Sequence, residues 1–184
     1  MRKPFKIAGN EDRITQILSE IQHQGGPEGL IIRPIRSEVD HSSILKMDRN
    51  EEELPSYFGV QNEHADDALT LVAEIDGKII GQMSSVLYIG ENTEEVDIEL
   101  WVDGVFVVPG RRGEGVGKCL GAATMEIVND YRLGLSVEAG LSEDGLIFPE
   151  GHTEEGSGGE ALIDWMCFYK LQREATHEGA CPAP

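Results

Sequence analysis

The stretch Val105-Phe106-Val107-Val108-Pro109-Gly110-Arg111-Arg112-Gly113-Glu114-Gly115-Val116-Gly117-Lys118 decides the fold of this chain. Its first four residues are β-branched or aromatic, which favours a strand, and the Pro-Gly pair ends that strand. Glycines at every second position follow, and an apolar pattern of helical spacing then begins. N–H groups at the start of a helix have no intrahelical partner and carry partial positive charge. The stretch therefore predicts a strand, an anion-binding loop and a helix, in that order.

Upstream, two apolar runs are separated by Asp76-Gly77, a dipeptide typical of a two-residue hairpin turn. We expect the runs Leu69 to Ile75 and Lys78 to Ile89 to pair as antiparallel strands. Ile98 to Val108 then adds a third strand to the same meander.

Downstream, apolar spacing predicts a helix from about Gly115 to Tyr131, and Leu133 to Ala139 reads as a further strand. Strand, helix and strand form a βαβ unit, so we expect this last strand to lie parallel to the one that ends at Val108. The acidic segment Leu141 to Ser157 reads as a loop. The expected fold class is mixed α/β: a central twisted sheet with an antiparallel N-terminal meander, one parallel step, and helices on both faces.

A helix and an edge strand precede the meander. One apolar stripe predicts the helix: Ile14, Ile17, Leu18 and Ile21. This helix either packs on the main domain or serves in a dimer, which periodicity does not distinguish. Leu30 to Arg36 predicts a strand with Pro34 at a sheet edge. Asp40 or Ser37 is then placed to cap a helix that runs through Ile44, Leu45 and Met47.

The end of the chain reads as one more helix. Its apolar side consists of Leu162, Trp165, Met166 and Tyr169, and Ser157 and Glu160 have the spacing of a capping box. We expect two units in all, a helical extension over residues 1–28 and the main domain over residues 29–184.

Charge narrows the choice of partner. The chain has 184 residues, with 34 acidic and 15 basic side chains and a formal net charge of −19. Nucleic acid is therefore not expected as a partner, because phosphates require lysine and arginine. A cationic substrate fits this charge, and so does a simply solvated acidic surface.

The composition also indicates the redox compartment of the protein and whether it binds a metal. Three scattered cysteines, with no Cys-x-x-Cys pair, favour a reducing compartment without a disulfide framework. No signal-peptide or membrane-spanning stretch is visible, so we expect a cytoplasmic protein that does not engage a membrane. The five histidines show no ligand spacing, and no metal is expected.

Two nucleotide-binding loops do not fit the glycine-rich stretch. If Gly117-Lys118 anchored a Walker loop, its first glycine would fall on Arg112, and Cys119 would replace the hydroxyl that binds magnesium. If Gly115-x-Gly117 began a dinucleotide fingerprint, its third glycine would fall on Leu120, and the upstream strands form an antiparallel meander.

The remaining pattern, Arg-x-x-Gly-x-Gly from Arg112 to Gly117, resembles the coenzyme A motif of the GNAT superfamily of acyl-CoA-dependent N-acetyltransferases. Two weaker stretches are also similar to that superfamily. Ile32-Arg33-Pro34 through Asp40 resembles its opening strand and helix cap, and Phe168-Tyr169-Lys170-Leu171 resembles its late Leu-Tyr-x-Lys-Leu segment. The resemblance extends from about Gly29 to Gln172.

The resemblance implies that acetyl-CoA lies between the strand that ends at Val108 and the parallel strand expected near Leu133. The pantetheine arm would pair with the backbone at Phe106, Val107 and Val108, and the pyrophosphate would accept hydrogen bonds from the loop. The loop residues so implied are Arg112, Gly113, Glu114, Gly115, Val116, Gly117 and Lys118.

Acetyl transfer to an amine requires a base for the amine and a proton for the departing thiolate. The resemblance places the base at Asp103, four residues ahead of Val107, and Glu99 lies on the same face by the two-residue period. Tyr169 falls on the superfamily's tyrosine that is proposed to protonate the thiolate. The alternatives remain open: both carboxylates also fit solvated strand-edge groups, and Tyr169 also fits a core aromatic residue.

The sequence therefore predicts an N-acetyltransferase that moves an acetyl group directly from acetyl-CoA to a primary amine of a small-molecule or peptide acceptor. A non-catalytic acyl-CoA-binding or assembly module is the alternative. The acceptor side departs from the superfamily pattern after Ala139 and after Leu171, where Gln172-Arg173 replaces Gly-Phe. Little chain remains there for a final strand pair, so a homodimer in which a partner completes the sheet is also expected.

Overall fold

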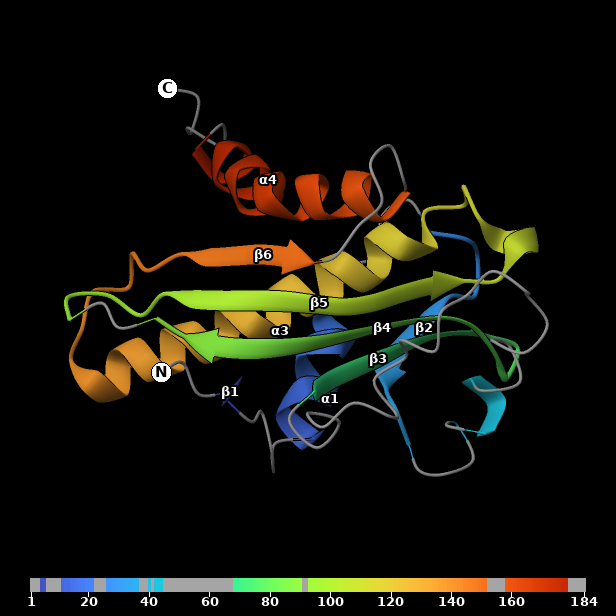
Figure 1. Ribbon diagram of the computed structural model, residues 1–184, viewed down its shortest axis with the longest axis horizontal. Coiled ribbons are helices and arrows are strands. Elements are labelled where there is room, and N and C mark those ends of the chain that lie inside the picture. Colours follow the sequence, from blue (N-terminus) through green and yellow to red (C-terminus); the bar gives the residue numbers. More distant parts are fainter. Residues whose placement is uncertain are drawn as a thin grey trace, which may run out of the picture.

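The computed structural model describes residues 4–5, 11–21, 26–36, 40, 42–44, 68–90, 93–151 and 158–178. Within them the chain forms one mixed sheet of strand order β2-β3-β4-β5-β6, and β1 pairs with β4 off this path (Figure 1). The strands are Pro4–Phe5 (β1), Ile31–Pro34 (β2), Ala68–Ile75 (β3), Lys78–Ile89 (β4), Ile98–Val107 (β5) and Ile147–Gly151 (β6). The helices are Glu11–Glu20 (α1), Val116–Ala139 (α3) and Gly158–Glu178 (α4), and a 3₁₀ turn spans Pro109–Arg111.

The predicted meander is confirmed. Strands β2 to β5 pair antiparallel, and β2 lies at the edge of the sheet, as the position of Pro34 predicts. The turn between β3 and β4 is Asp76-Gly77, with φ of 50° and 75°. Left-handed conformations at both central residues match the twist of a tight hairpin, and Asp and Gly tolerate them.

The strand expected over Leu133 to Ala139 is wrong, because these residues form the last two turns of α3. Apolar and polar side chains alternate here as in a strand, but the buried positions are Val128, Arg132 and Ser136. A spacing of four places them on one face of a helix. The helix ends at Gly140, whose φ of 65° is left-handed.

The strand that lies parallel to β5 is β6, inside the segment that the sequence predicts to be a loop. Its register runs from Ile98 opposite Ile147 to Val102 opposite Gly151. Just before β6, a Cβ on Gly145 would overlap the Val96 carbonyl oxygen, so only glycine permits this approach. The βαβ unit is therefore present, and its second strand lies further along the chain than expected.

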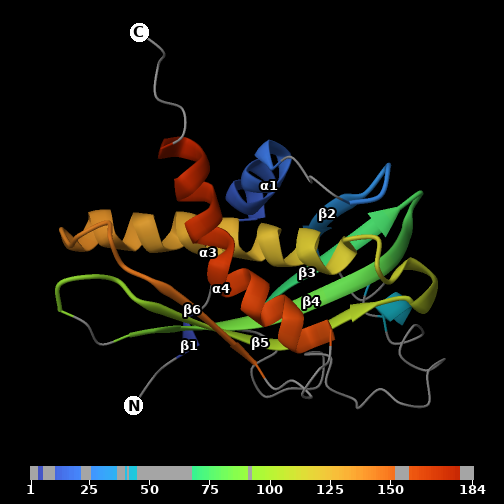
Figure 2. The ribbon, with the colours of Figure 1, turned by 90° about the horizontal axis from the view of Figure 1, so that it is seen from above.

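The helices are arranged in layers around the sheet. Figure 2 shows α1 and α3 on one face, with α3 running back along β5, and α4 crossing α3 beside β6. A Cβ on Gly121 would lie 3.2 Å from Leu162 and Met166, so the missing side chain lets α3 and α4 approach closely. On the other face, both views show the short helical segment at Asp40 and Ser42–Ile44. Mixed α/β architecture with helices on both faces is thus confirmed.

Helix α1 packs on the main domain. Ile14, Ile17 and Leu18 are buried in the same cluster as the α3 face of the sheet, and Arg13 forms an ion pair with Asp130 of α3. This resolves the alternative that the sequence leaves open. A domain boundary at residue 28 remains a prediction, and the expectations for Ser37, Leu45, Met47 and Ser157 lie outside the described residues.

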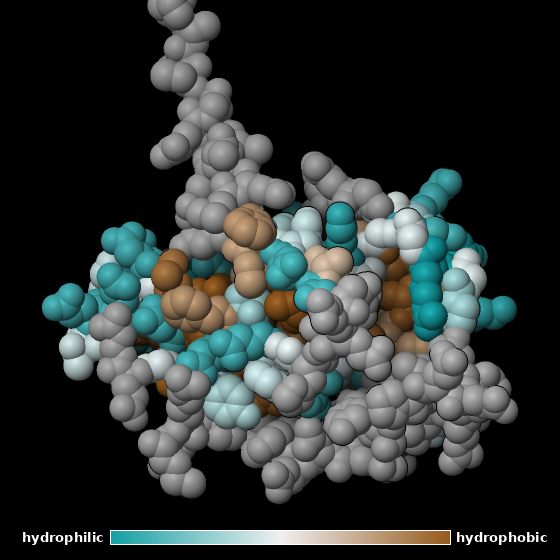
Figure 3. Space-filling view, turned by 45° about the horizontal axis from the view of Figure 1, so that its top comes forward, coloured by the Kyte–Doolittle hydropathy of each residue, from teal (hydrophilic) through white to brown (hydrophobic). Residues whose placement is uncertain are grey.

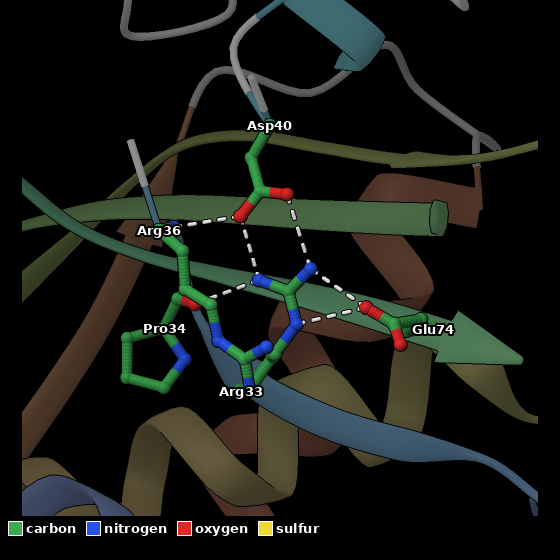
Figure 4. Close-up of polar contacts among 5 residues, drawn as sticks. All are labelled: Arg33, Pro34, Arg36, Asp40 and Glu74. Atoms are coloured by element: carbon green, nitrogen blue, oxygen red, sulfur yellow. Dashed lines mark hydrogen bonds and ion pairs between the residues drawn. The ribbon is translucent and has the colours of Figure 1, made fainter. Parts of the chain in front are cut away.

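An ion network holds the edge strand β2 to its neighbour (Figure 4). The buried Arg33 guanidinium donates to both carboxylate oxygens of Asp40, at 2.6 and 3.1 Å, and to Glu74 of β3. The Arg36 N–H donates to Asp40 at 2.7 Å. The hydrogen bonds from Arg33 are the main reason that the pKa of Asp40 lies below its ordinary value, against the opposing effect of burial.

Asp40→Asn is expected to lower the free energy of unfolding by about 2 kcal/mol near pH 7, because Arg33 loses one of its two anionic partners. The folded-state pKa of Asp40 is below the unfolded value of about 4. This stabilisation is therefore complete above the unfolded value and is lost as the pH falls through the folded one. Urea unfolding from about pH 7 to pH 3 should show the two proteins converging in acid. The control Asp76→Asn, in the exposed hairpin turn, should match wild type; a difference between wild type and Asp40→Asn that does not vary with pH would contradict the account.

Candidate functional site

Strand β5 is longer than its parallel neighbour, and this difference creates the site. The last residue of β6, Gly151, pairs with Val102, whereas β5 continues to Val107. Beyond that pair, no described strand lies beside β5 on this side. The sheet therefore opens where β5 approaches the glycine-rich loop.

Alternate peptide groups of this stretch face the opening. The Val108 N–H donates to the Ile80 carbonyl of β4 at 2.9 Å, and the Phe106 carbonyl also faces β4, since it would lie 3.0 Å from a Cβ on Gly81. Because the backbone of a strand alternates, the peptide groups of Val105 and Val107 point away from β4. Of the residues that the sequence predicts for backbone pairing, Val107 faces the opening. Val105 was missed, although a two-residue period from Val107 would have found it.

The glycine-rich loop that follows adopts conformations that favour glycine. Gly113 and Gly115 both have φ of 83°, and a Cβ on Gly113 would enter open space. Gly115 is the N-cap of α3 and, as a glycine, makes no side-chain hydrogen bond to cap the helix. The first N–H groups of α3 therefore receive no capping side chain from this position, which suits them to bind an anion.

Charged side chains surround this loop. Arg112 donates from Nε to the Val107 carbonyl at 2.9 Å, and its guanidinium lies 5.7 Å from the centre of the Phe106 ring. Arg111 pairs with Glu114 at 3.2 Å, which offsets the negative charge of the one acid in the loop. Arg112 therefore ties the loop to the open end of β5.

Helix α4 forms a wall beside the loop and the opening. Leu162 lies 3.9 Å from where a Cβ on Gly117 would stand, and Ile163 lies 3.5 Å from the corresponding point on Gly151. Lys118 extends over the Trp165 ring at 5.8 Å. The first turns of α4 thus bridge the start of α3 and the end of β6.

The two candidate bases occupy different places along β5. Asp103 is the first residue beyond the last β6 pair, at a register irregularity in which Ser84 faces Gly104 and Ser85 faces Val102. Glu99 lies four residues earlier, where β5 is paired on both sides, opposite Tyr88 and Phe148. Asp103 alone lies at the point where the sheet opens, and the irregularity there interrupts the two-residue period that links it to Glu99.

Tyr169 lies in the contact between α3 and α4. Its hydroxyl donates to the Glu126 carboxylate at 3.0 Å, and its ring lies 5.1 Å from that of Trp165. Ten helical residues separate Glu126 from Val116 and rise about 15 Å. Four strand residues from Val107 back to Asp103 span about 13 Å. Because α3 runs back along β5 (Figure 1), Glu126, the partner of Tyr169, and Asp103 are at similar distances along the chain elements that leave the loop. No pattern in the sequence indicated Glu126.

The cysteine next to the loop is not a plausible nucleophile. Cys119 is 4% exposed, in the first turns of α3, and burial raises the pKa of its thiol. A thiol with a raised pKa stays protonated near neutral pH, and only the thiolate is nucleophilic.

The described part of the chain contains neither a cluster of metal-ligating side chains nor a membrane-spanning helix. No group of three or more His, Cys, Asp or Glu side chains within it is arranged to hold a metal ion. No helix in these ranges is both long enough and apolar enough to cross a bilayer.

Several solved structures resemble this chain at low identity. A ribosomal-protein-alanine N-acetyltransferase from Brucella melitensis biovar Abortus is 18% identical, with 74% of this chain and 89% of that one covered and a TM-score of 0.45. An aminoglycoside acetyltransferase from an uncultured soil metagenomic sample is 17% identical, with 79% and 88% covered and a TM-score of 0.44. The aminoglycoside N-acetyltransferase AAC(6')-Iy, solved in complex with CoA, is 17% identical, with 73% and 88% covered and a TM-score of 0.43.

No curated protein sequence matches the chain. The family model for the acetyltransferase (GNAT) family matches residues 38–142, which is more than half of the chain. The matched range contains the meander, the open half of β5, the glycine-rich loop and all of α3. The chain belongs to the GNAT family of acetyltransferases and is an acyltransferase of that type.

Proposed function

We propose that this protein transfers an acetyl group from acetyl-CoA to a primary amine of a small-molecule or peptide acceptor, by direct transfer. The observation that carries the proposal is the part of β5 beyond its last described pair with β6, which leads into a loop of left-handed glycines at the start of α3. An extended amide-containing arm that ends in a pyrophosphate matches both parts of this surface.

The residues present fit acetyl-CoA. The pyrophosphate would accept hydrogen bonds from N–H groups between Arg112 and Lys118, where no side-chain cap competes for the start of α3. The pantetheine amides would pair with Val105 and Val107, which face the opening. Phe106 and Val108, also expected from the sequence, would contribute through their side chains, because their backbone groups face β4.

Acetyl-CoA supplies an activated thioester, and the chain has to manage two protons. We assign the base that deprotonates the amine to Asp103, because it lies where β5 leaves its β6 partner. Glu99 is the second candidate for this role. Tyr169 is the candidate proton donor to the thiolate; to act, its O–H turns toward the sulfur from the Glu126 carboxylate, to which it donates in the free protein. The buried thiol of Cys119 favours direct transfer over an acyl-cysteine intermediate.

A cationic acceptor fits the charge of the protein. The formal net charge of −19 attracts protonated amines and raises their local concentration near the surface. We therefore propose polyamines, amino sugars and basic peptides as the first acceptors to test. Cytoplasmic localisation stays a prediction.

The expected homodimer also stays a prediction, but the outer edge of β6 is a poor candidate for its interface. The Ile98 N–H donates to the Leu146 carbonyl, so by alternation Pro149 faces the outer edge of β6, where it offers no N–H. That edge is therefore poorly suited to pairing with a partner strand. Three large apolar side chains in or next to β6 and α4 are exposed: Leu146, Phe148 and Phe168. Figure 3 shows brown, hydrophobic areas on one face of the molecule.

Saturating acetyl-CoA is expected to stabilise the protein, by about 2.7 kcal/mol at 100 times the dissociation constant, because the ligand binds only the folded state. Gly115→Glu should abolish this stabilisation, since it places a carboxylate where the pyrophosphate binds and forces a left-handed φ on a residue with a side chain. Differential scanning fluorimetry measures both effects. The matched control is Gly110→Glu, whose Cβ enters open space outside the proposed cradle and should leave the shift intact. A wild-type protein that acetyl-CoA does not stabilise would refute the cradle.

Release of free CoA thiol with a panel of cationic amines tests the transfer itself. Asp103→Asn is expected to lower kcat about 100-fold or more, in the range typical of a lost general base. Glu99→Gln should lower it little. Tyr169→Phe should lower kcat without changing the stabilisation by acetyl-CoA, because the ring and its packing on Trp165 remain. Unchanged kcat in both Asp103→Asn and Tyr169→Phe would remove these assignments, and acetyl-CoA binding without thiol release by any amine would favour a non-catalytic module.

A further inference from the structure

A polar row crosses the sheet on the face opposite α3. Residues of β4 alternate between faces: Met83, which accepts a hydrogen bond from Thr124, looks toward α3, and Gln82 and Ser84 look the other way. In register, Ser84 lies between Thr70 of β3 and Gly104 of β5. Buried hydroxyl and amide groups therefore occupy the middle of the sheet, next to the open end of β5.

One atom of this row lacks a partner. The Gln82 amide donates from Nε2 to the Ser84 hydroxyl at 3.2 Å, and that hydroxyl is 3.0 Å from the Thr70 hydroxyl. Gln82 is fully buried, and its Oε1 has no hydrogen-bond partner among the described residues. Turning the amide by half a rotation would only exchange which of its two atoms is left over.

A buried amide group without a partner is unfavourable for folding and calls for a functional explanation. The Gln82 amide extends along β4 toward Ser84, and therefore toward Gly104. Gly104 directly follows Asp103 and carries no side chain. The Gln82 amide thus contacts the residue that pairs with Gly104, next to Asp103, the base proposed for the acceptor amine.

We infer that the Gln82 amide binds a hydroxyl group of the acceptor, so that this enzyme acetylates hydroxylated amines in preference to amines of the same shape without a hydroxyl. A hydroxyl both donates and accepts, so it satisfies either orientation of the amide. A site built to hydrogen-bond a hydroxyl disfavours the analogue that lacks it, because a buried polar group is then left unpaired. This inference rests on the proposed acetyl transfer and deepens it.

The test compares isosteric acceptor pairs, ethanolamine against propylamine and 3-amino-1-propanol against butylamine. The wild-type protein is expected to show kcat/KM at least about tenfold higher for the hydroxylated member, mainly through KM. Thermal stabilisation of the CoA-bound protein by each amine gives a second readout that does not depend on turnover. Gln82→Met keeps the length of the side chain and removes both polar atoms, and it should reduce both preferences to about twofold or less.

The matched control is Ser85→Ala. The Ser85 hydroxyl is also fully buried and without a partner in the described part of the chain, but Ser85 lies on the face toward α3. This variant should retain the full preference. The inference would be overturned if the wild type had equal kcat/KM for both members of each pair. An undiminished preference in Gln82→Met would also overturn it.

Failure of the proposed function would look different. In that case acetyl-CoA would not stabilise the protein, or no amine would release thiol. Suppose instead that acetyl-CoA stabilises the protein and that thiol is released equally fast with and without a hydroxyl on the acceptor. That result would support the proposed function and refute only the role of Gln82.

Discussion

The unequal length of two parallel strands is the constraint on which this structure depends. β6 stops at Gly151, and β5 continues for five residues to Val107. A strand edge inside a protein leaves N–H and C=O groups that need partners. Here the edge leads to the glycine-rich loop and the start of α3, so backbone groups of Val105 and Val107 and the first N–H groups of the helix lie at one end of the sheet. The close approach of α4 to α3 at Gly121 keeps the helical wall of that opening in place.

At Asp103, the irregularity changes which residues of β5 point to each face of the sheet. Before it, Ile98, Leu100 and Val102 are buried in the core toward α3; after it, Val105 and Val107 pack against that same core. The alternation therefore shifts from even to odd residues at Asp103. This shift places Phe106 and Gly104 on the opposite face beside the buried amide of Gln82, so polar groups gather there, whereas the face toward α3 is apolar.

Part of this architecture could be predicted from the sequence because the signals are local. Asp76-Gly77 requires a tight hairpin, and the glycines from Gly113 to Gly117 require a loop before a helix. β6 could not be predicted, since five residues that include Pro149 and Glu150 carry no strand periodicity, and Leu133 to Ala139 imitated a strand more closely. The irregularity at Asp103, the unpaired amide of Gln82 and the contact of Tyr169 with Glu126 depend on tertiary register, which no spacing in the sequence encodes.

Amide hydrogen exchange with and without acetyl-CoA tests the central claim most directly, because it reads individual backbone groups. If acetyl-CoA adds to the open edge of β5 and to the start of α3, the N–H groups of Val105, Val107 and the loop from Gly113 to Gly117 become protected. Those of Ser42–Ile44, on the other face of the sheet, are then unchanged. The account would be contradicted if the N–H groups of Val105 and Val107 exchanged as fast with acetyl-CoA as in the free protein.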